Sequence, residues 1–271
     1  MAMWAVCYIK GRHGATTAAA GLAFAAPPHA HAVVVECDPA GGDLMRRHRL
    51  AAMPGLVGLA TAARGDATTA QALAGSVQPW RIGDRTIDVV VAPSGGAQTR
   101  VALSVLARPG QNTLNPPDRL VIADCGRLDF TSPARPLLAM ADAVLVLTRA
   151  RADELAHLRE RLADLVDVAA GRLTIVLAPG GVYPPADVAD VVRGHLVREL
   201  ARDGDDARVY GPLPDDRQAA AVLAGDLVAG RRWRRLPLMT ALERLAGRLG
   251  PRPATAPRTP ADRTAPRETS R

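Results

Sequence analysis

Short apolar runs alternate with helical segments along most of this chain, and that alternation limits its fold more than any other feature. Brief apolar runs bounded by glycine or proline are typical of strands buried on both faces. A regular strand–helix alternation predicts an α/β fold, a mostly parallel twisted sheet with helices on both faces. The 271 residues are enough for one large domain with its own core.

The segmentation predicts seven strands and seven helices. The strands are Trp4–Ile9, Ala32–Glu36, Thr86–Ala92, Leu120–Asp124, Ala143–Thr148, Leu173–Leu177 and Arg208–Tyr210. The helices are Thr16–Ala26, Gly55–Arg64, Thr99–Leu106, Ala152–Val168, Pro185–Ala201, Asp215–Leu223 and Leu238–Leu249. We expect one domain over residues 1–250 and a disordered, basic Pro/Arg tail over 251–271, because the tail has no apolar side chains beyond Ala and Pro.

Lys10 is the only lysine among 34 basic residues. It follows the first predicted strand and opens a glycine-containing loop that leads into a helix. Such a loop can bind phosphate, because its N–H groups and the helix N-terminus point at the anion. Lysine is a compact ammonium that fits beside a phosphate where the arginine fork does not, although chance would also explain one lysine. The strict pattern G-x-x-x-x-G-K-[ST] is not met, because Ala15 stands at its lysine position.

The loop resembles the deviant Walker A loop, K-G-G-x-G-K-[ST]-T, of the MinD/ParA group of P-loop ATPases. The resemblance implies ATP and Mg²⁺ as cofactors, with Lys10 as the signature lysine and Thr16 as the magnesium-binding hydroxyl. Arg12 replaces a family glycine, and Ala15 replaces the phosphate-binding lysine. The implied nucleotide-binding loop is Lys10, Gly11, Arg12, His13, Gly14, Ala15, Thr16 and Thr17.

Further segments resemble the family's motifs in the expected order, over roughly residues 3 to 249. Ala32–Pro39 resembles a strand ending in D-x-D-P, with Glu36 in place of the first aspartate and Asp38 as the second. Leu120–Gly126 resembles a Walker B segment ending at Asp124, and 141–148 resembles the next strand. Residues 211–216 resemble a late G-x-(I/L)-P-x-D turn, which implies contacts to the base from Pro214 and Asp215.

The two aspartates can also be interpreted physically. Asp124 ends an apolar strand, where a carboxylate is costly unless it has a partner such as Mg²⁺ or its water shell. Asp38 leaves a neighbouring strand at the same edge and could hold a water for in-line attack on a terminal phosphate. We therefore expect Thr16, Asp38 and Asp124 at the magnesium, and Asp38 and Lys10 as the catalytic groups. The alternatives are a helix cap near Gly42 for Asp38 and a turn carboxylate for Asp124.

The missing lysine decides what is expected of catalysis. A Walker lysine neutralises charge that develops on the transferring phosphate, and Ala15 supplies none. By resemblance, Lys10 could reach the nucleotide of a partner subunit, or Arg12 could supply charge within the loop. We expect weakened nucleotide binding, with ATP hydrolysis that is slow or absent.

The positive charge lies at the C-terminal end. Residues 231–271 carry 11 arginines and three acids, whereas the rest of the chain is nearly neutral. The helix Leu238–Leu249 has one leucine-rich face, which is typical either of a last helix packed on the sheet or of a reversible membrane anchor such as MinD-like proteins have at this end. Arg231–Arg271 could meet anionic lipid, non-specific DNA or protein.

Three classes of function follow. The first is a MinD/ParA-like protein that dimerises on ATP and positions a partner in chromosome or plasmid partitioning, or in secretion or pilus machinery. The second is a non-catalytic ParA-like scaffold of the TadZ/CpaE type, and the third is a small-molecule synthetase. Three unpatterned cysteines favour a reducing cytoplasm, with the inner face of the membrane as an alternative location. The Arg- and Ala-rich composition suggests a GC-rich bacterial genome.

Overall fold

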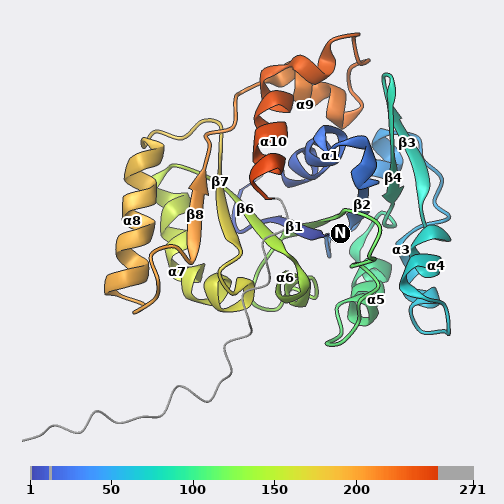
Figure 1. Cartoon of the computed structure of the whole chain (residues 1–271), viewed down its shortest axis with the longest axis horizontal. Coiled ribbons are helices and arrows are strands. Elements are labelled where there is room, and N and C mark those ends of the chain that lie inside the picture. The colour runs from blue at the N-terminus through green and yellow to red at the C-terminus, as the bar shows by residue number, and fades with distance from the viewer. Residues whose placement is uncertain (1, 12–13, 250–271) are drawn as a thin grey trace, which may run out of the picture.

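The computed structural model describes residues 2–11 and 14–249, and within them the chain forms one eight-stranded sheet (Figure 1). The strand order is β3-β4-β2-β5-β1-β6-β7-β8. The strands are β1 (Met3–Tyr8), β2 (Val33–Glu36), β3 (Gln78–Ile82), β4 (Arg85–Val90), β5 (Val121–Arg127), β6 (Ala143–Arg149), β7 (Leu173–Ala178) and β8 (Ala207–Tyr210). All neighbouring pairs are parallel except β3 with β4, so the predicted α/β fold is confirmed.

Helices cover both faces of the sheet. One face carries α1 (Ala15–Ala25), α9 (Arg217–Ala224) and α10 (Pro237–Arg248) (Figure 1). The other face carries the following helices: α3 (Leu56–Ala62), α4 (Thr69–Ala74), α5 (Gly96–Leu106), α6 (Arg135–Met140), α7 (Ala152–Ala169) and α8 (Pro185–Arg198). The short α2 (Leu44–Arg47) follows β2. Two apolar layers therefore form the core, one on each side of a sheet whose central strands are buried.

The sequence missed the edge strand β3 and the short helices α2, α4 and α6. β3 alternates buried and exposed residues and pairs antiparallel with β4, joined by a tight turn at Gly83–Asp84. Pro79 weakens the strand pattern of this segment, but proline is compatible with an edge strand, where one side needs no N–H donor. Helices of four to six residues are too short for a periodic signal.

The leucine-rich C-terminal helix is part of the core. Leu238, Leu242 and Leu245 of α10 are buried, and a methyl group of Leu242 fills the space that a Cβ at Gly21 of α1 would need. Its apolar face therefore meets α1 and is not free to enter a bilayer. No helix among the described residues is both long and apolar enough to cross a membrane. Residues 251–271 lie outside the described part, so the predicted tail stays a prediction.

Truncating Leu242 tests the role of α10. We expect Leu242→Ala to lower the free energy of unfolding by about 2–5 kcal/mol, because it opens a cavity between two helices that pack closely. Val191→Ala, at a 63% exposed position of α8, should change it by less than about 0.5 kcal/mol. Urea unfolding followed by circular dichroism measures both, and equal effects for the two variants would contradict a core role for α10.

Candidate functional site

The strand order brings the sequence-predicted residues together. β1 lies beside β5, and β5 lies beside β2, so the carboxyl ends of these three strands meet at one edge of the sheet. The glycine loop follows β1, Asp38 follows β2 and Asp124 lies in β5. Ligands of open α/β sheets bind at such carboxyl ends. The described residues of the loop and the two aspartates therefore lie near one another at these strand ends.

The loop has backbone geometry suited to an anion. Gly11 and Gly14 have φ angles of 83° and 72°, in the left-handed region that favours glycine. Helix α1 begins directly after Gly14, and no side chain caps it. Its first-turn N–H groups can therefore donate to a phosphate. Arg12 and His13 of the predicted loop lie outside the described residues, and the side chain of Ala15 is buried at the start of α1.

Asp124 is the central acidic group of the site. Its side chain is 2% exposed and accepts a hydrogen bond from the Thr16 hydroxyl. Its pKa is raised to about 7, mainly by burial and also by the nearby Glu36 and Asp38 carboxylates, while the hydrogen bonds from Thr16 and the Gly126 N–H oppose the shift. None of the main contributions to this pKa from the described residues comes from a cation. Asp124 is therefore a buried carboxyl group and not an exposed turn residue, and its role as a magnesium ligand stays a prediction.

Asp38 lies against the end of β5, beside Asp124. The pairing of β1 with β5 shifts after Asp124, and Gly126 follows with a φ of 58°. A Cβ at Gly126 would lie 2.0 Å from the Asp38 carboxylate, so only glycine leaves room for that side chain. Burial raises the pKa of Asp38, and its Oδ1 accepts the N–H of Ala40 at 2.8 Å. The alternative of a helix cap near Gly42 is not found, because α2 begins at Leu44.

Glu36 has a structural role that the motif comparison did not predict. It is 2% exposed, and its carboxylate accepts the N–H groups of Asp43, Leu44 and Ala92 at 2.7, 2.9 and 2.9 Å. It therefore joins the segment after β2 to the segment after β4. A Cβ at Gly42 would lie 2.3 Å from the same carboxylate. A glutamate ending an apolar strand was the available signal, since a buried acid needs such donors.

The residues present fit a magnesium ion bound together with phosphates. Mg²⁺ usually takes one or two carboxylates and completes its shell with water and phosphate oxygens. Thr16 and Asp124 supply a hydroxyl and a carboxylate in contact, and Asp38 lies beside them. Within residues 2–11 and 14–249, no three His, Cys, Asp or Glu side chains gather as a self-sufficient metal site. The donor set thus suits an ion that arrives with a nucleotide.

Lys10 does not point at the Asp124 carboxylate. Its Nζ lies 2.7 Å from Nε2 of His157 on α7, and both side chains are exposed. The contact joins residues 147 positions apart, and no sequence pattern predicted it. Lys10 is therefore held at the surface, on the α7 side of the loop.

The late turn lies at a separate strand end. The Leu213 N–H donates to the Leu177 carbonyl at 2.8 Å, so Pro214 and Asp215 follow the carboxyl end of β7. The Asp215 side chain is exposed, and the next residue, Asp216, caps α9 and also accepts the N–H of Leu238. The structure places this turn at the carboxyl end of β7, two strands from β1, and the predicted base contacts stay a prediction.

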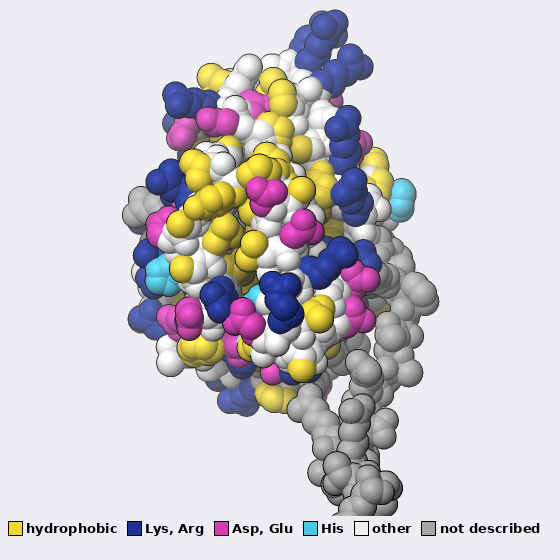
Figure 2. Space-filling view, turned by 90° about the vertical axis from the view of Figure 1, so that its left-hand side faces the viewer, with side chains coloured by type: hydrophobic (Ala, Val, Ile, Leu, Met, Phe, Trp, Pro, Cys, Tyr) yellow, Lys and Arg dark blue, Asp and Glu magenta, His cyan; other side chains and the backbone are white. Residues whose placement is uncertain are grey.

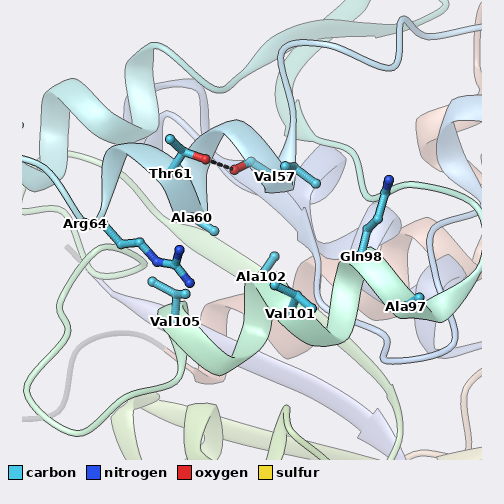
Figure 3. A pocket seen from close by; sticks show the side chains of 9 residues that line it. All are labelled: Val57, Ala60, Thr61, Arg64, Ala97, Gln98, Val101, Ala102 and Val105. Atoms are coloured by element: carbon cyan, nitrogen blue, oxygen red, sulfur yellow. Dashed lines mark hydrogen bonds between the residues drawn. The ribbon is translucent and has the colours of Figure 1, made fainter.

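A separate apolar hollow lies between α3 and α5 (Figure 3). Its volume is about 310 Å³, and its walls are mainly valine and alanine side chains with Arg64 and Gln98 at the rim. Val101 is 62% exposed there. The hollow has no acidic lining residue and no backbone loop for phosphate, so it is distinct from the site described above.

Solved structures match the whole fold. No protein-family model matches the chain, and no curated protein matches its sequence. A ParA family ATPase from Chlorobium tepidum has a TM-score of 0.64 at 17% identity, covering 90% of this chain and 97% of that one. MinD from Pyrococcus horikoshii, solved with Mg-ADP, has a TM-score of 0.64 at 14% identity, and the match covers 92% of this chain and 96% of that one. A variant of Cyanothece McdA with ATP has a TM-score of 0.60 at 15% identity, and the match covers 94% of this chain and 98% of that one. The chain has the fold of ParA and MinD ATPases, which confirms at the level of fold the resemblance that its motifs indicated.

The raised pKa of Asp124 predicts a pH dependence of stability in the absence of metal and nucleotide. Between about pH 4 and 7 the folded protein holds a proton on Asp124 that the unfolded chain releases, so stability should fall as pH rises through this range. The slope from this group is at most about 1.4 kcal/mol per pH unit. Asp124→Asn should flatten it, whereas Asp153→Asn at an exposed position should not. Urea unfolding at several pH values measures how the unfolding free energy depends on pH. An unchanged pH slope in Asp124→Asn would show that Asp124 is not its source.

Replacing Glu36 tests its bridging role. Glu36→Gln puts an amide NH₂ where an acceptor is needed, so one backbone N–H loses its partner, and we expect a loss of about 1–3 kcal/mol in unfolding free energy. Glu160→Gln at an exposed site of α7 is the matched control and should be neutral. Hydrogen exchange should also speed up at Leu44 and Ala92 in the Glu36 variant alone. Unaltered exchange at both amides would contradict the bridge.

Proposed function

We propose that this protein binds Mg·ATP at the loop after β1, dimerises on the nucleotide and positions a partner in the manner of MinD and ParA proteins. The observation that carries the proposal is the Thr16–Asp124 pair, with Asp38 beside it, at the carboxyl ends of three adjacent strands. Mg²⁺, when bound, would neutralise phosphate charge there. The fold supports the proposal, since its structural neighbours include MinD with Mg-ADP and McdA with ATP.

The chain's own groups have separable roles in this proposal. The N–H groups of the uncapped first turn of α1 bind phosphate. Thr16 and Asp124 orient the metal, and Asp38, beside the site and half-buried, holds the attacking water. Ala15 brings no charge, so transition-state stabilisation is weak and hydrolysis is slow. Binding with little turnover would suit a switch whose state is set by nucleotide occupancy.

Lys10 is a cation of the loop that could serve the nucleotide. Its exposed ammonium lies at the rim of the site, where a second copy of the chain could approach it. To act in a dimer it must leave His157 and turn toward a phosphate. The proposed partners are therefore a second copy of the chain and a cargo protein, with the protein acting in the cytoplasm or at the membrane surface.

A non-catalytic scaffold is the second candidate. Ala15 favours it because the group most closely tied to phosphate binding is missing. The Lys10–His157 contact also favours it, since it holds the remaining lysine away from Asp124. In that case the fold would present a partner surface without nucleotide control.

Calorimetric titration of Mg·ATP into the full chain separates the two candidates. We expect binding that weakens at least about tenfold in Thr16→Ala and in Lys10→Ala, because each loses an interaction with charged phosphate or metal. Arg208→Ala, an exposed arginine on the far edge strand β8, should bind as the wild type does. Light scattering should show an ATP-dependent dimer that Lys10→Ala fails to form.

The opposite outcome is equally clear. Absence of heat up to millimolar ATP, with no change in mass, would exclude the nucleotide switch and favour the scaffold. Ala15→Lys adds a further test through phosphate release. A rise in hydrolysis would show that Asp38 and Asp124 are competent, whereas no rise despite binding would place the defect elsewhere in the site.

A further inference from the structure

The connection between α9 and α10 combines exposed apolar and basic side chains. We call residues 227–235, together with Arg81 and Arg85 of the β3–β4 hairpin, the arginine tip. Val228 is 91% exposed and Leu227 is 46% exposed, and four arginines follow at 231, 232, 234 and 235, all with exposed side chains. Basic side chains project from the end of the molecule (Figure 2) that carries this connection and the hairpin in Figure 1.

Trp233 fixes the arginine tip to the core. Its ring is 3% exposed and packs edge-on against Phe24 at a centroid distance of 5.6 Å. The hairpin turn closes over it, since a Cβ at Gly83 would lie 3.0 Å from its indole nitrogen and 3.2 Å from the Cβ of Ala229. A buried tryptophan in the middle of an arginine run forces the flanking arginines outward. The exposed residues are therefore held in place by the fold.

The charge of the tip is strongly positive. Residues 226–235 contain four arginines and one acid, Asp226, and the hairpin adds Arg81 and Arg85 against Asp84. Arg85 donates to the Ala26 carbonyl, and its pKa is lowered by burial and by the nearby Arg234. An anionic surface would offset the repulsion between the Arg85 and Arg234 guanidinium groups. No acid forms a salt bridge with the arginines of the tip within the part of the chain that is described.

We propose that the arginine tip docks on an anionic lipid bilayer, with Leu227 and Val228 entering the headgroup region and the arginines contacting lipid phosphates. A nucleic-acid backbone would bind the arginines but would offer no apolar surface for the two exposed aliphatic side chains. A bilayer interface offers favourable contacts to both kinds of side chain. The leucine face of α10 cannot supply this contact, because it is buried against α1. The surface is thus separate from both the nucleotide site and the last helix.

Vesicle sedimentation with the full chain tests the proposal. Phosphatidylcholine vesicles with and without phosphatidylglycerol are compared, and binding is expected only with the anionic lipid. Leu227→Ser with Val228→Ser should weaken that binding about tenfold, because the apolar contact is lost while every charge remains. Glutamine at the four arginines 231, 232, 234 and 235 should weaken it more, at about fivefold per arginine.

The matched control is Val191→Ser with Val197→Ser, which removes two aliphatic side chains that are 63% and 52% exposed elsewhere, on α8. It should bind as the wild type does. The basic residues 251–271 are present in every variant, so their contribution cancels. Thermal unfolding should show that all variants fold, since the replaced side chains are exposed.

Insertion can be observed directly. The three native cysteines are buried, so an environment-sensitive fluorophore can be attached selectively to Val228→Cys and, as a control, to Val191→Cys. A blue shift on anionic vesicles at 228 alone supports the proposal. Undiminished vesicle binding by the Leu227/Val228 variant would overturn it. So would tight binding of short duplex DNA with no vesicle binding, because the tip would then be a phosphate-backbone surface.

Discussion

The cost of burying a carboxylate organises the candidate site. Asp124 lies in β5 between β1 and β2, where apolar residues surround it, and its pKa is raised to about 7. An ionised acid at such a place requires compensation by donors or by a cation. Thr16 and Gly126 give partial compensation, and the remaining need is what makes Mg²⁺ a fitting ligand. The glycine loop leads to Thr16, which contacts Asp124, and the missing side chain at Gly126 leaves room for Asp38 beside it.

A second buried acid shows how environment separates two roles. Glu36 is the last residue of β2 and Asp124 lies in the neighbouring strand β5, where the two residues are register partners. Glu36 has three backbone N–H donors, so it holds loops together, whereas Asp124 has one hydroxyl and one N–H. Only Asp124 is left with capacity for a ligand. The resemblance implied a magnesium role for Asp124 and only a motif position for Glu36, and the hydrogen bonds show what Glu36 does.

The sequence predicted most of the architecture because buried parallel strands have a strong local signature. β1, β2, β5, β6 and β7 are mainly apolar and buried, and each was predicted to within three residues at either end. The edge strand β3 and the short helices lack that signature, because their residues are partly exposed and their length is below one clear period. The motif positions Thr16, Asp38 and Asp124 were predicted in one site, and the structure places them near the carboxyl ends of neighbouring strands. Their binding roles stay predictions.

The sequence by itself determined the strand–helix alternation, the glycine loop before α1, the missing lysine at Ala15 and the basic C-terminal end. These properties are local, so residue type and spacing were sufficient to find them. Only the tertiary structure decided that Leu242 packs against Gly21, that Lys10 meets His157, and that Trp233 holds exposed arginines beside Val228. Each of these contacts joins distant segments, and packing between such segments is set by the sheet and its two helix layers, not by any local pattern.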